Sequence, residues 1–142
     1  MAHAAHTVMI EKPIGDVFAF LADATNDPKW RPQVTSITHV SGSGVGAVYA
    51  QTMKGPGGRP IAGDFRITRY DEPTRLDFEV IAGPARPTGS YVLRDAGSGA
   101  TQITFTLDLK PRGLMVLLSA MIGKQVKSEV ANLANLPSAI GA

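Results

Sequence analysis

Few side chains in this sequence could carry metal or nucleophilic chemistry. The chain has no cysteine and only three histidines, His3, His6 and His39, which excludes disulfides, thiolate nucleophiles and cysteine zinc sites. We expect His3 and His6 to lie in a frayed terminus and His39 on a strand near a glycine-rich loop. A Ser–His–Asp triad would have to use His39, and no nucleophile elbow is present. We therefore expect no metal site, no cofactor and no hydrolytic triad.

The carboxylates are expected mainly on turns or on the outward faces of strands. None is expected on an apolar face, where burial would suit it to acid–base work. The turn set is Asp23, Asp27, Asp71, Glu72 and Asp95, and the strand set is Asp64, Asp77, Glu79 and Asp108. Glu129, beside Val130, is interpreted as a partner of the lysines one helical turn back. The alternative is that Glu129 reaches the rim of a sheet.

The remaining candidates are bulky apolar and tyrosine side chains. Each one taken singly fits an ordinary core. Taken together on a curved sheet beneath a long helix, they predict an apolar pocket with a few polar groups, which Tyr49, Gln51 and Tyr91 could supply. The predicted ligand-binding set is Trp30, Tyr49, Met53, Phe65, Phe78, Tyr91, Phe105, Met115, Leu118, Met121 and Ile122. Trp30 and Met53 are expected near the entrance.

Length and charge limit the class of protein. A chain of 142 residues with 44% hydrophobic residues predicts one domain, residues 1–142, with a real core. A net charge of only +2 argues against a nucleic-acid partner. The longest apolar stretch, residues 113–123, is too short to cross a membrane. No signal peptide is visible, and we expect a cytoplasmic protein, monomer or homodimer, without stable membrane insertion.

Two glycine-rich segments invite comparison with phosphate-binding loops. They read SGSGVG at residues 41–46 and GPGGRP at residues 55–60. Neither ends in Gly-Lys-Ser/Thr and neither opens a helix, so a helix N-terminus for phosphate is missing. Both are interpreted as turns between strands.

The hydrophobic period changes twice along the chain. A strand at residues 6–12 leads to a short helix that Pro13 can start, and a second short turn of helix follows at residues 28–33. The period is then two over residues 34–40, 47–54, 61–70, 75–81, 89–94 and 101–109, which predicts strands. A long helix is expected over about residues 112–136, ended by Pro137. This order predicts an α+β protein with a curved antiparallel sheet of seven strands around that helix.

Pairing patterns predict two hairpins. With a four-residue loop, Tyr70 would face Arg75, Ile67 would face Phe78, Phe65 would face Val80 and Arg66 would face Glu79. In the second hairpin, Leu93 can meet Ile103 and Tyr91 can meet Phe105.

Motifs along nearly the whole chain share one known pattern. They are IEKPIGDVFAFL at 10–21, Asp23, NDPKWRP at 26–32, GVG at 44–46, DEPTRLDF at 71–78 and KSEVANLANL at 127–136. This set resembles the polyketide cyclase/dehydrase branch of the START-like (SRPBCC) superfamily, which includes the birch-pollen allergen fold. The resemblance implies a helix-grip fold with a hydrophobic cavity between sheet and helix. It also implies that Pro13, Val17, Asp23 and Trp30 are largely structural.

Two functions from different classes follow. The first is binding of a hydrophobic small molecule, namely a lipid, a polyketide or an aromatic metabolite. The alternative is an aromatase/cyclase-type enzyme in which Tyr91 or Tyr49 donates a proton to a developing enolate. A regulatory protein with a vestigial cavity is a third possibility.

Overall fold

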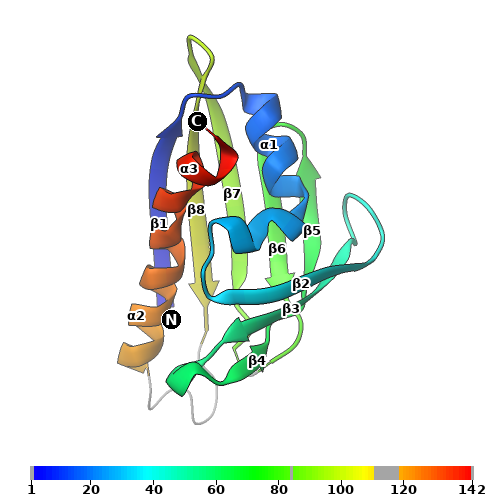
Figure 1. The fold of residues 1–142 in the computed structure, drawn as a ribbon, viewed down its shortest axis with the longest axis vertical. Coiled ribbons are helices and arrows are strands. Elements are labelled where there is room, and N and C mark those ends of the chain that lie inside the picture. Colours follow the sequence, from blue (N-terminus) through cyan, green and yellow to red (C-terminus); the bar gives the residue numbers. More distant parts are fainter. Residues whose placement is uncertain (1, 84, 111–118, 142) are drawn as a thin grey trace.

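The chain forms one antiparallel sheet that is covered by helices on one side. The computed structural model describes residues 2–83, 85–110 and 119–141. The strands are β1 (Ala2–Ile10), β2 (Val34–Ser41), β3 (Val48–Lys54), β4 (Pro60–Ala62), β5 (Phe65–Asp71), β6 (Arg75–Val80), β7 (Thr88–Gly97) and β8 (Ala100–Leu109). They are ordered β1-β8-β7-β6-β5-β3-β2, and β4 pairs with β3 off that path. Figure 1 shows β2 and β3 running across the direction of β5–β8, so the sheet is strongly curved.

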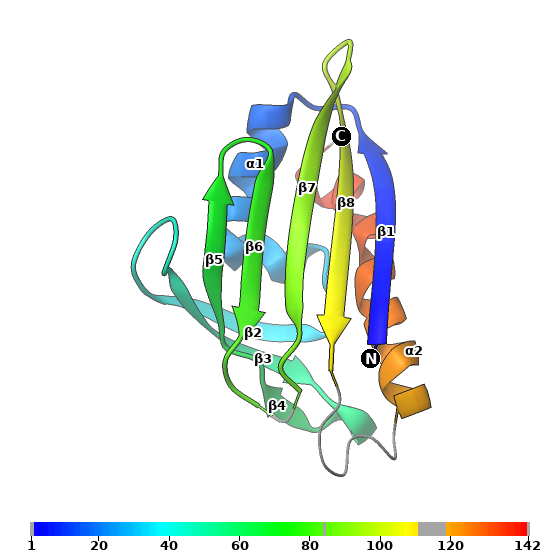
Figure 2. The ribbon, with the colours of Figure 1, turned by 180° about the vertical axis from the view of Figure 1, so that it is seen from behind.

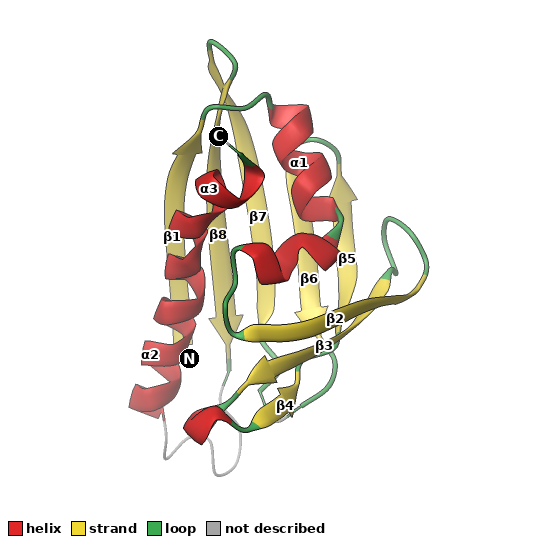
Figure 3. Ribbon diagram, in the orientation of Figure 1, coloured by secondary structure: helices red, strands yellow, loops and turns green. Residues whose placement is uncertain are grey.

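The helices lie on the concave side of this sheet. They are α1 (Ile14–Ala22), η1 (Ala24–Lys29), η2 (Pro56–Gly58), α2 (Ser119–Ala131), η4 (Asn132–Asn135) and α3 (Leu136–Ile140). Apart from η2, which connects β3 to β4, they lie on one side of β5–β8 (Figure 3), and the view from behind in Figure 2 shows those strands uncovered. The predicted α+β class and the two short helices after the first strand are confirmed.

The first strand begins earlier than predicted. β1 pairs with β8 from Ala2 opposite Leu109 to Ile10 opposite Thr101, and the ring of His3 contacts the carboxylate of Asp108 at 2.5 Å. The expectation of a frayed terminus around His3 and His6 was wrong because a full edge of β8 is available to pair with it.

The predicted strand over residues 61–70 is divided into β4 and β5. Both halves keep one register against β3, with Thr52 opposite Ala62 and Tyr49 opposite Phe65. Between them, the carboxylate of Asp64 accepts the backbone N–H of Gln51 at 3.1 Å. The side-chain amide of Gln51 in turn donates to the carbonyl of Gly63 at 3.2 Å. The backbone N–H of Gln51 and the carbonyl of Gly63 therefore bond to side chains and not to each other. This interrupts the strand, so the sheet has eight strands where seven were predicted.

The hairpin registers are confirmed where the strands are regular. Phe65 lies opposite Val80, Arg66 opposite Glu79 and Ile67 opposite Phe78, and the second hairpin has the predicted pairs. A register shift after Ile67 places Tyr70 opposite Leu76, so the predicted pairing of Tyr70 with Arg75 was wrong. A bulge adds one residue to one strand, and alternation alone does not reveal it.

The predicted C-terminal helix is present, and its described part buries one side, but its bounds differ from the prediction. Val126, Val130 and Leu133 are buried, and α2 packs against β1 and β8. The predicted start near residue 112 lies outside the described residues. The predicted end before Pro137 was wrong, because the helical path continues through η4 into α3, where Pro137 occupies the first turn. Proline is tolerated there since the first helical N–H groups need no partner.

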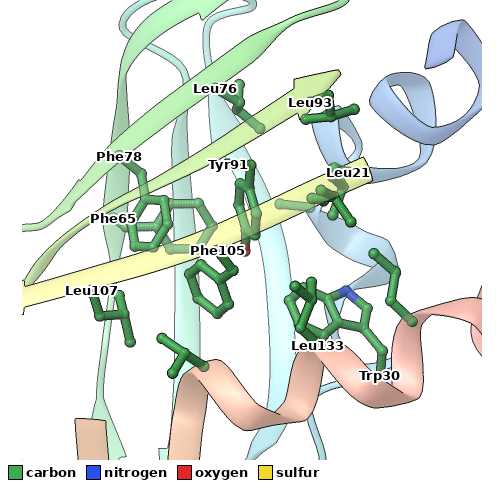
Figure 4. Packing of buried hydrophobic residues seen from close by; sticks show 14 of the residues in the cluster. Leu21, Trp30, Phe65, Leu76, Phe78, Tyr91, Leu93, Phe105, Leu107 and Leu133 are labelled. Carbon is green, nitrogen blue, oxygen red and sulfur yellow. The ribbon is translucent and has the colours of Figure 1, made fainter. Parts of the chain in front are cut away.

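A row of aromatic rings crosses the concave face of the sheet, with one ring from each successive strand. The rings are Tyr49 on β3, Phe65 on β5, Phe78 on β6, Tyr91 on β7 and Phe105 on β8. Neighbouring centroids along the row are 4.7 to 5.9 Å apart. Trp30, just after η1, continues the row at 5.8 Å from Phe105. Figure 4 shows five of these rings, those of Trp30, Phe65, Phe78, Tyr91 and Phe105, packed between the sheet and the helix that carries Leu133.

Candidate functional site

A cavity of about 110 Å³ lies between the curved sheet, η1 and α2. At about 30 Å³ for each water molecule, this volume corresponds to roughly four waters, so it suits a small organic molecule. Its described lining is mainly apolar and comes from β3 to β8, α1, η1 and α2. An apolar cavity with few polar groups is typical of small-molecule sites.

Only part of the predicted ligand-binding set lines the cavity. Met53, Phe65, Phe78 and Tyr91 do so, whereas the described lining does not include Trp30, Tyr49 or Phe105. Met115 and Leu118 lie outside the described residues. Met121 and Ile122 belong to α2, but their side chains also lie outside the part that the structure describes.

Trp30 is an interior residue, and its expected place near the entrance was wrong. Only 1% of its surface is exposed, and its ring packs edge-on against Tyr91 and Phe105. Tyr49 is turned away from the described cavity, and its hydroxyl donates to the carbonyl of Ala22 at 3.4 Å. Both side chains stabilise the wall around the cavity.

One end of the cavity is formed by a buried cluster of charged and polar side chains. Arg31 Nη1 lies 3.0 Å from Asp27 Oδ2, and Arg31 Nη2 lies 3.4 Å from Glu129 Oε2. Arg31 Nη1 also donates to the side-chain oxygen of Gln51 at 3.4 Å. Asp27, Arg31 and Glu129 are 4%, 6% and 7% exposed, and all four side chains line the cavity. The cluster therefore joins η1, β3 and α2 at one point.

The local sequence positions Asp27 and Arg31 through the short helix η1. Asp23 caps this helix by accepting the N–H of Thr25 at 3.2 Å. Asp27 and Arg31 are four residues apart, and the N–H of Arg31 donates to the carbonyl of Asp27 at 2.8 Å. This spacing brings the two side chains to the same side of the segment.

Burial controls the electrostatics of the cluster. Burial raises the pKa of Asp27 to about 6, although the neighbouring guanidinium of Arg31 opposes the shift. Burial alone would lower the pKa of Arg31, but Asp27 and Glu129 outweigh it and hold that pKa above its ordinary value. Arg31 therefore stays charged, while Asp27 exchanges its proton near pH 6.

Tyr91 places a hydroxyl group beside this cluster. Burial raises its pKa well above the ordinary value of 10, so the phenol stays protonated at neutral pH. Within the described part of the chain, no hydrogen bond of this hydroxyl is found. Figure 4 shows the Tyr91 ring projecting from β7 toward the helices. The hydroxyl is therefore able to donate a hydrogen bond to a molecule in the cavity.

The cluster corrects two expectations about carboxylates. Asp27 was expected on a solvated turn, and Glu129 was interpreted as a partner of nearby lysines. Both are instead buried around Arg31. The four-residue spacing of Asp27 and Arg31, and the place of Glu129 next to buried Val130, were the available signals.

Among residues 2–83, 85–110 and 119–141, no group of three or more potential ligands could hold a metal ion. In the same described ranges, no helix is long and apolar enough to span a membrane.

Comparisons with known proteins agree with this architecture. The family model described as polyketide cyclase/dehydrase and lipid transport matches residues 1–136, whereas no curated protein matches. The protein TTHA0849 from Thermus thermophilus has a TM-score of 0.82 at 17% identity, covering 97% of this chain and 96% of that one.

Two other solved structures share the fold. A START superfamily protein from Mycobacterium smegmatis has a TM-score of 0.81 at 13% identity, covering 99% of this chain and 97% of that one. The Zhui aromatase/cyclase from Streptomyces sp. R1128 has a TM-score of 0.76 at 16% identity, covering 97% and 90%. The predicted helix-grip fold and START-like resemblance are confirmed, and the chain belongs to the polyketide cyclase/dehydrase and lipid transport family.

Proposed function

We propose that the protein binds a hydrophobic small molecule in the cavity between the sheet and α2. The observation that carries this proposal is the apolar, partly aromatic lining, with one polar cluster at its end. Enclosing an apolar molecule there removes its surface from water, which contributes roughly 25 cal/mol for each Å² buried. A lipid, a polyketide or an aromatic metabolite would meet this requirement.

A cavity-filling variant tests the proposal. Val80 on β6 lines the cavity, so Val80→Trp should fill it and weaken binding of naphthylmethanol by at least about tenfold in calorimetry. Val92 on β7 is equally half-buried, but it lies on the opposite face from Tyr91, so Val92→Trp should leave binding unchanged.

Native mass spectrometry of the purified protein gives an independent readout. We expect a co-purifying apolar compound in the wild type that Val80→Trp lacks. If no bound species is found and naphthylmethanol does not titrate, the proposal fails and a regulatory protein with a vestigial cavity becomes the better interpretation.

A second candidate function is an aromatase/cyclase-type enzyme. The placement of Tyr91 favours it, since a protonated phenol lies beside Asp27, Arg31 and Glu129 at the wall of the cavity. In such a reaction Tyr91 would give its proton to the oxygen of a developing enolate and regain one from water. Tyr49 does not serve this role, because its hydroxyl is turned to Ala22.

The enzyme candidate has its own test. Tyr91→Phe should abolish turnover of a poly-β-ketone thioester while the affinity for that compound is kept. Equal loss of turnover and affinity would leave binding as the function, and full turnover in Tyr91→Phe would remove Tyr91 from the chemistry.

We also propose that residues 1–142 act as a single cytoplasmic domain, as a monomer or homodimer. A chain without cysteine fits a cytoplasmic location, because it needs no oxidising compartment, and a length of 142 residues is typical of one domain. Light scattering after size-exclusion chromatography measures the oligomeric state, and a larger assembly would contradict it.

A further inference from the structure

We propose that the cavity takes a hydrophobic molecule whose polar end is a protonated amine, bound by Asp27 and Glu129 beside the ring of Tyr91. This inference rests on the proposed binding function and names the class of ligand. Its basis is the charge of the polar cluster, the state of Arg31 and the aromatic wall.

The charge of the cluster is unbalanced. Within the described lining, the charged side chains are Asp27, Arg31 and Glu129. Two carboxylates therefore face one guanidinium, and the cluster is negative overall when all three are ionised. In an apolar surrounding this excess charge is poorly screened. A cation supplied by the ligand would balance it.

Arg31 has little capacity left for an anionic ligand. Its Nη1 already contacts Asp27 at 3.0 Å and its Nη2 contacts Glu129 at 3.4 Å. Its Nε is buried without a partner among the described residues, so a molecule in the cavity does not reach that atom. A ligand carboxylate would add a third negative group around one cation, which electrostatic complementarity disfavours.

The aromatic wall favours a cation in the cavity, and Tyr91 lies beside the charged cluster. Phe65, Phe78 and Tyr91 line the cavity, with Phe78 5.6 Å from Phe65 and 5.9 Å from Tyr91 between centroids. Ring faces attract ammonium groups, and the attraction grows when water is excluded. A neutral hydroxyl group would gain neither this contact nor the charge balance.

In the free protein below about pH 6, a proton on Asp27 supplies the balancing charge. The groups facing Asp27 are Arg31 and Asp23 on its own segment, Glu129 on α2 and the hydroxyls of Tyr91 and Tyr49 on the sheet. A bound ammonium group would replace that proton. Binding of the amine should therefore release a proton near pH 6 and weaken at lower pH.

Three probes that share one scaffold separate the possibilities. We would titrate the full-length protein calorimetrically with naphthylmethylamine, naphthylmethanol and naphthoate at neutral pH. The amine should bind at least about tenfold more tightly than the alcohol, and naphthoate should bind most weakly. Lowering the pH to about 5 should weaken the amine by about tenfold and leave the alcohol unchanged.

Charge-removing variants identify the residues. Asp27→Asn and Glu129→Gln should each reduce the preference for the amine over the alcohol, measured as the ratio of the two affinities in the same variant. Glu79→Gln removes a carboxylate that pairs with Arg66 away from the described cavity lining and should keep the full preference. If circular dichroism shows that neither variant folds, the wild type is titrated with naphthylmethylamine at pH 6 in two buffers of different ionisation enthalpy. Proton release on binding makes the measured binding enthalpy differ between the two buffers, and equal enthalpies would overturn the inference.

The outcomes distinguish this inference from the proposed function. Equal binding of amine and alcohol, or a preference that survives both variants, would overturn the inference and leave apolar binding intact. Tightest binding of naphthoate would also overturn it. If none of the three probes binds, the proposed function fails together with the inference.

Discussion

Replacing Asp27 with asparagine should flatten the pH dependence of the free energy of unfolding. Burial raises the pKa of Asp27 from 3.8 to about 6 in the folded protein. Between these two values the folded state binds a proton that the unfolded state releases. The wild-type protein therefore loses stability as the pH rises through this window, and Asp27→Asn does not have this proton to lose.

The magnitude follows from the size of the pKa difference. Each unit of difference corresponds to about 1.4 kcal/mol, so the shift of Asp27 is equivalent to about 3 kcal/mol. The free energy of unfolding of the wild type, minus that of Asp27→Asn, should fall by most of this amount, roughly 2 kcal/mol, between about pH 4 and pH 7.5. Most other titrating groups are common to both proteins and cancel in the difference.

Urea denaturation followed by the fluorescence of Trp30 measures both proteins across this range. Glu72 is an exposed carboxylate in the turn before β6, so Glu72→Gln serves as a control with no comparable change. A difference that stays constant with pH would refute the reasoning. A difference that grows with pH would show that the attraction of Arg31 outweighs burial and that the pKa of Asp27 is lowered.

Three further substitutions test the packing around the cavity. Arg31→Met leaves two buried carboxylates without a cation and should lower the free energy of unfolding by about 3–5 kcal/mol in urea at neutral pH; a stabilised variant would contradict the ion cluster. In Gly89→Ala the new Cβ would lie 2.3 Å from Cζ of Phe78, so thermal denaturation should show a loss of about 1–3 kcal/mol. An unchanged melting temperature would mean that the ring of Phe78 moves aside freely. Leu133→Ala removes a fully buried side chain of η4 and should cost about 2–5 kcal/mol in the same assay, whereas a loss below about 1 kcal/mol would argue against tight docking of this helix.

The sheet could be predicted because its signals are local. The pairing of Ile67 with Phe78 follows from the alternation of apolar residues and from the short turn between the two strands. Both signals are contained in neighbouring residues of the sequence. The bulge after Ile67 and the break at Gly63 depend on backbone groups and side-chain partners, which leave no trace in the period of hydrophobic residues.

The polar end of the cavity could not be predicted for a different reason. Arg31 and Glu129 are 98 residues apart and meet only when α2 closes over the sheet. Asp27 lies in a short helix that contains Pro28 and has no regular period. The sequence therefore predicted an apolar cavity with Gln51 and Tyr91 among its few polar groups, and the fold adds a buried ion cluster to its wall.

The row of aromatic rings has an optical consequence. Trp30 is the single tryptophan of the chain, and it lies at the end of a row that contains Tyr49 and Tyr91. Light absorbed by these tyrosines is transferred to the indole over short distances, so the emission of the protein is concentrated beside the cavity wall. A molecule that displaces Tyr91 would change the excitation spectrum of this emission, and the protein carries its own spectroscopic label for whatever enters the cavity.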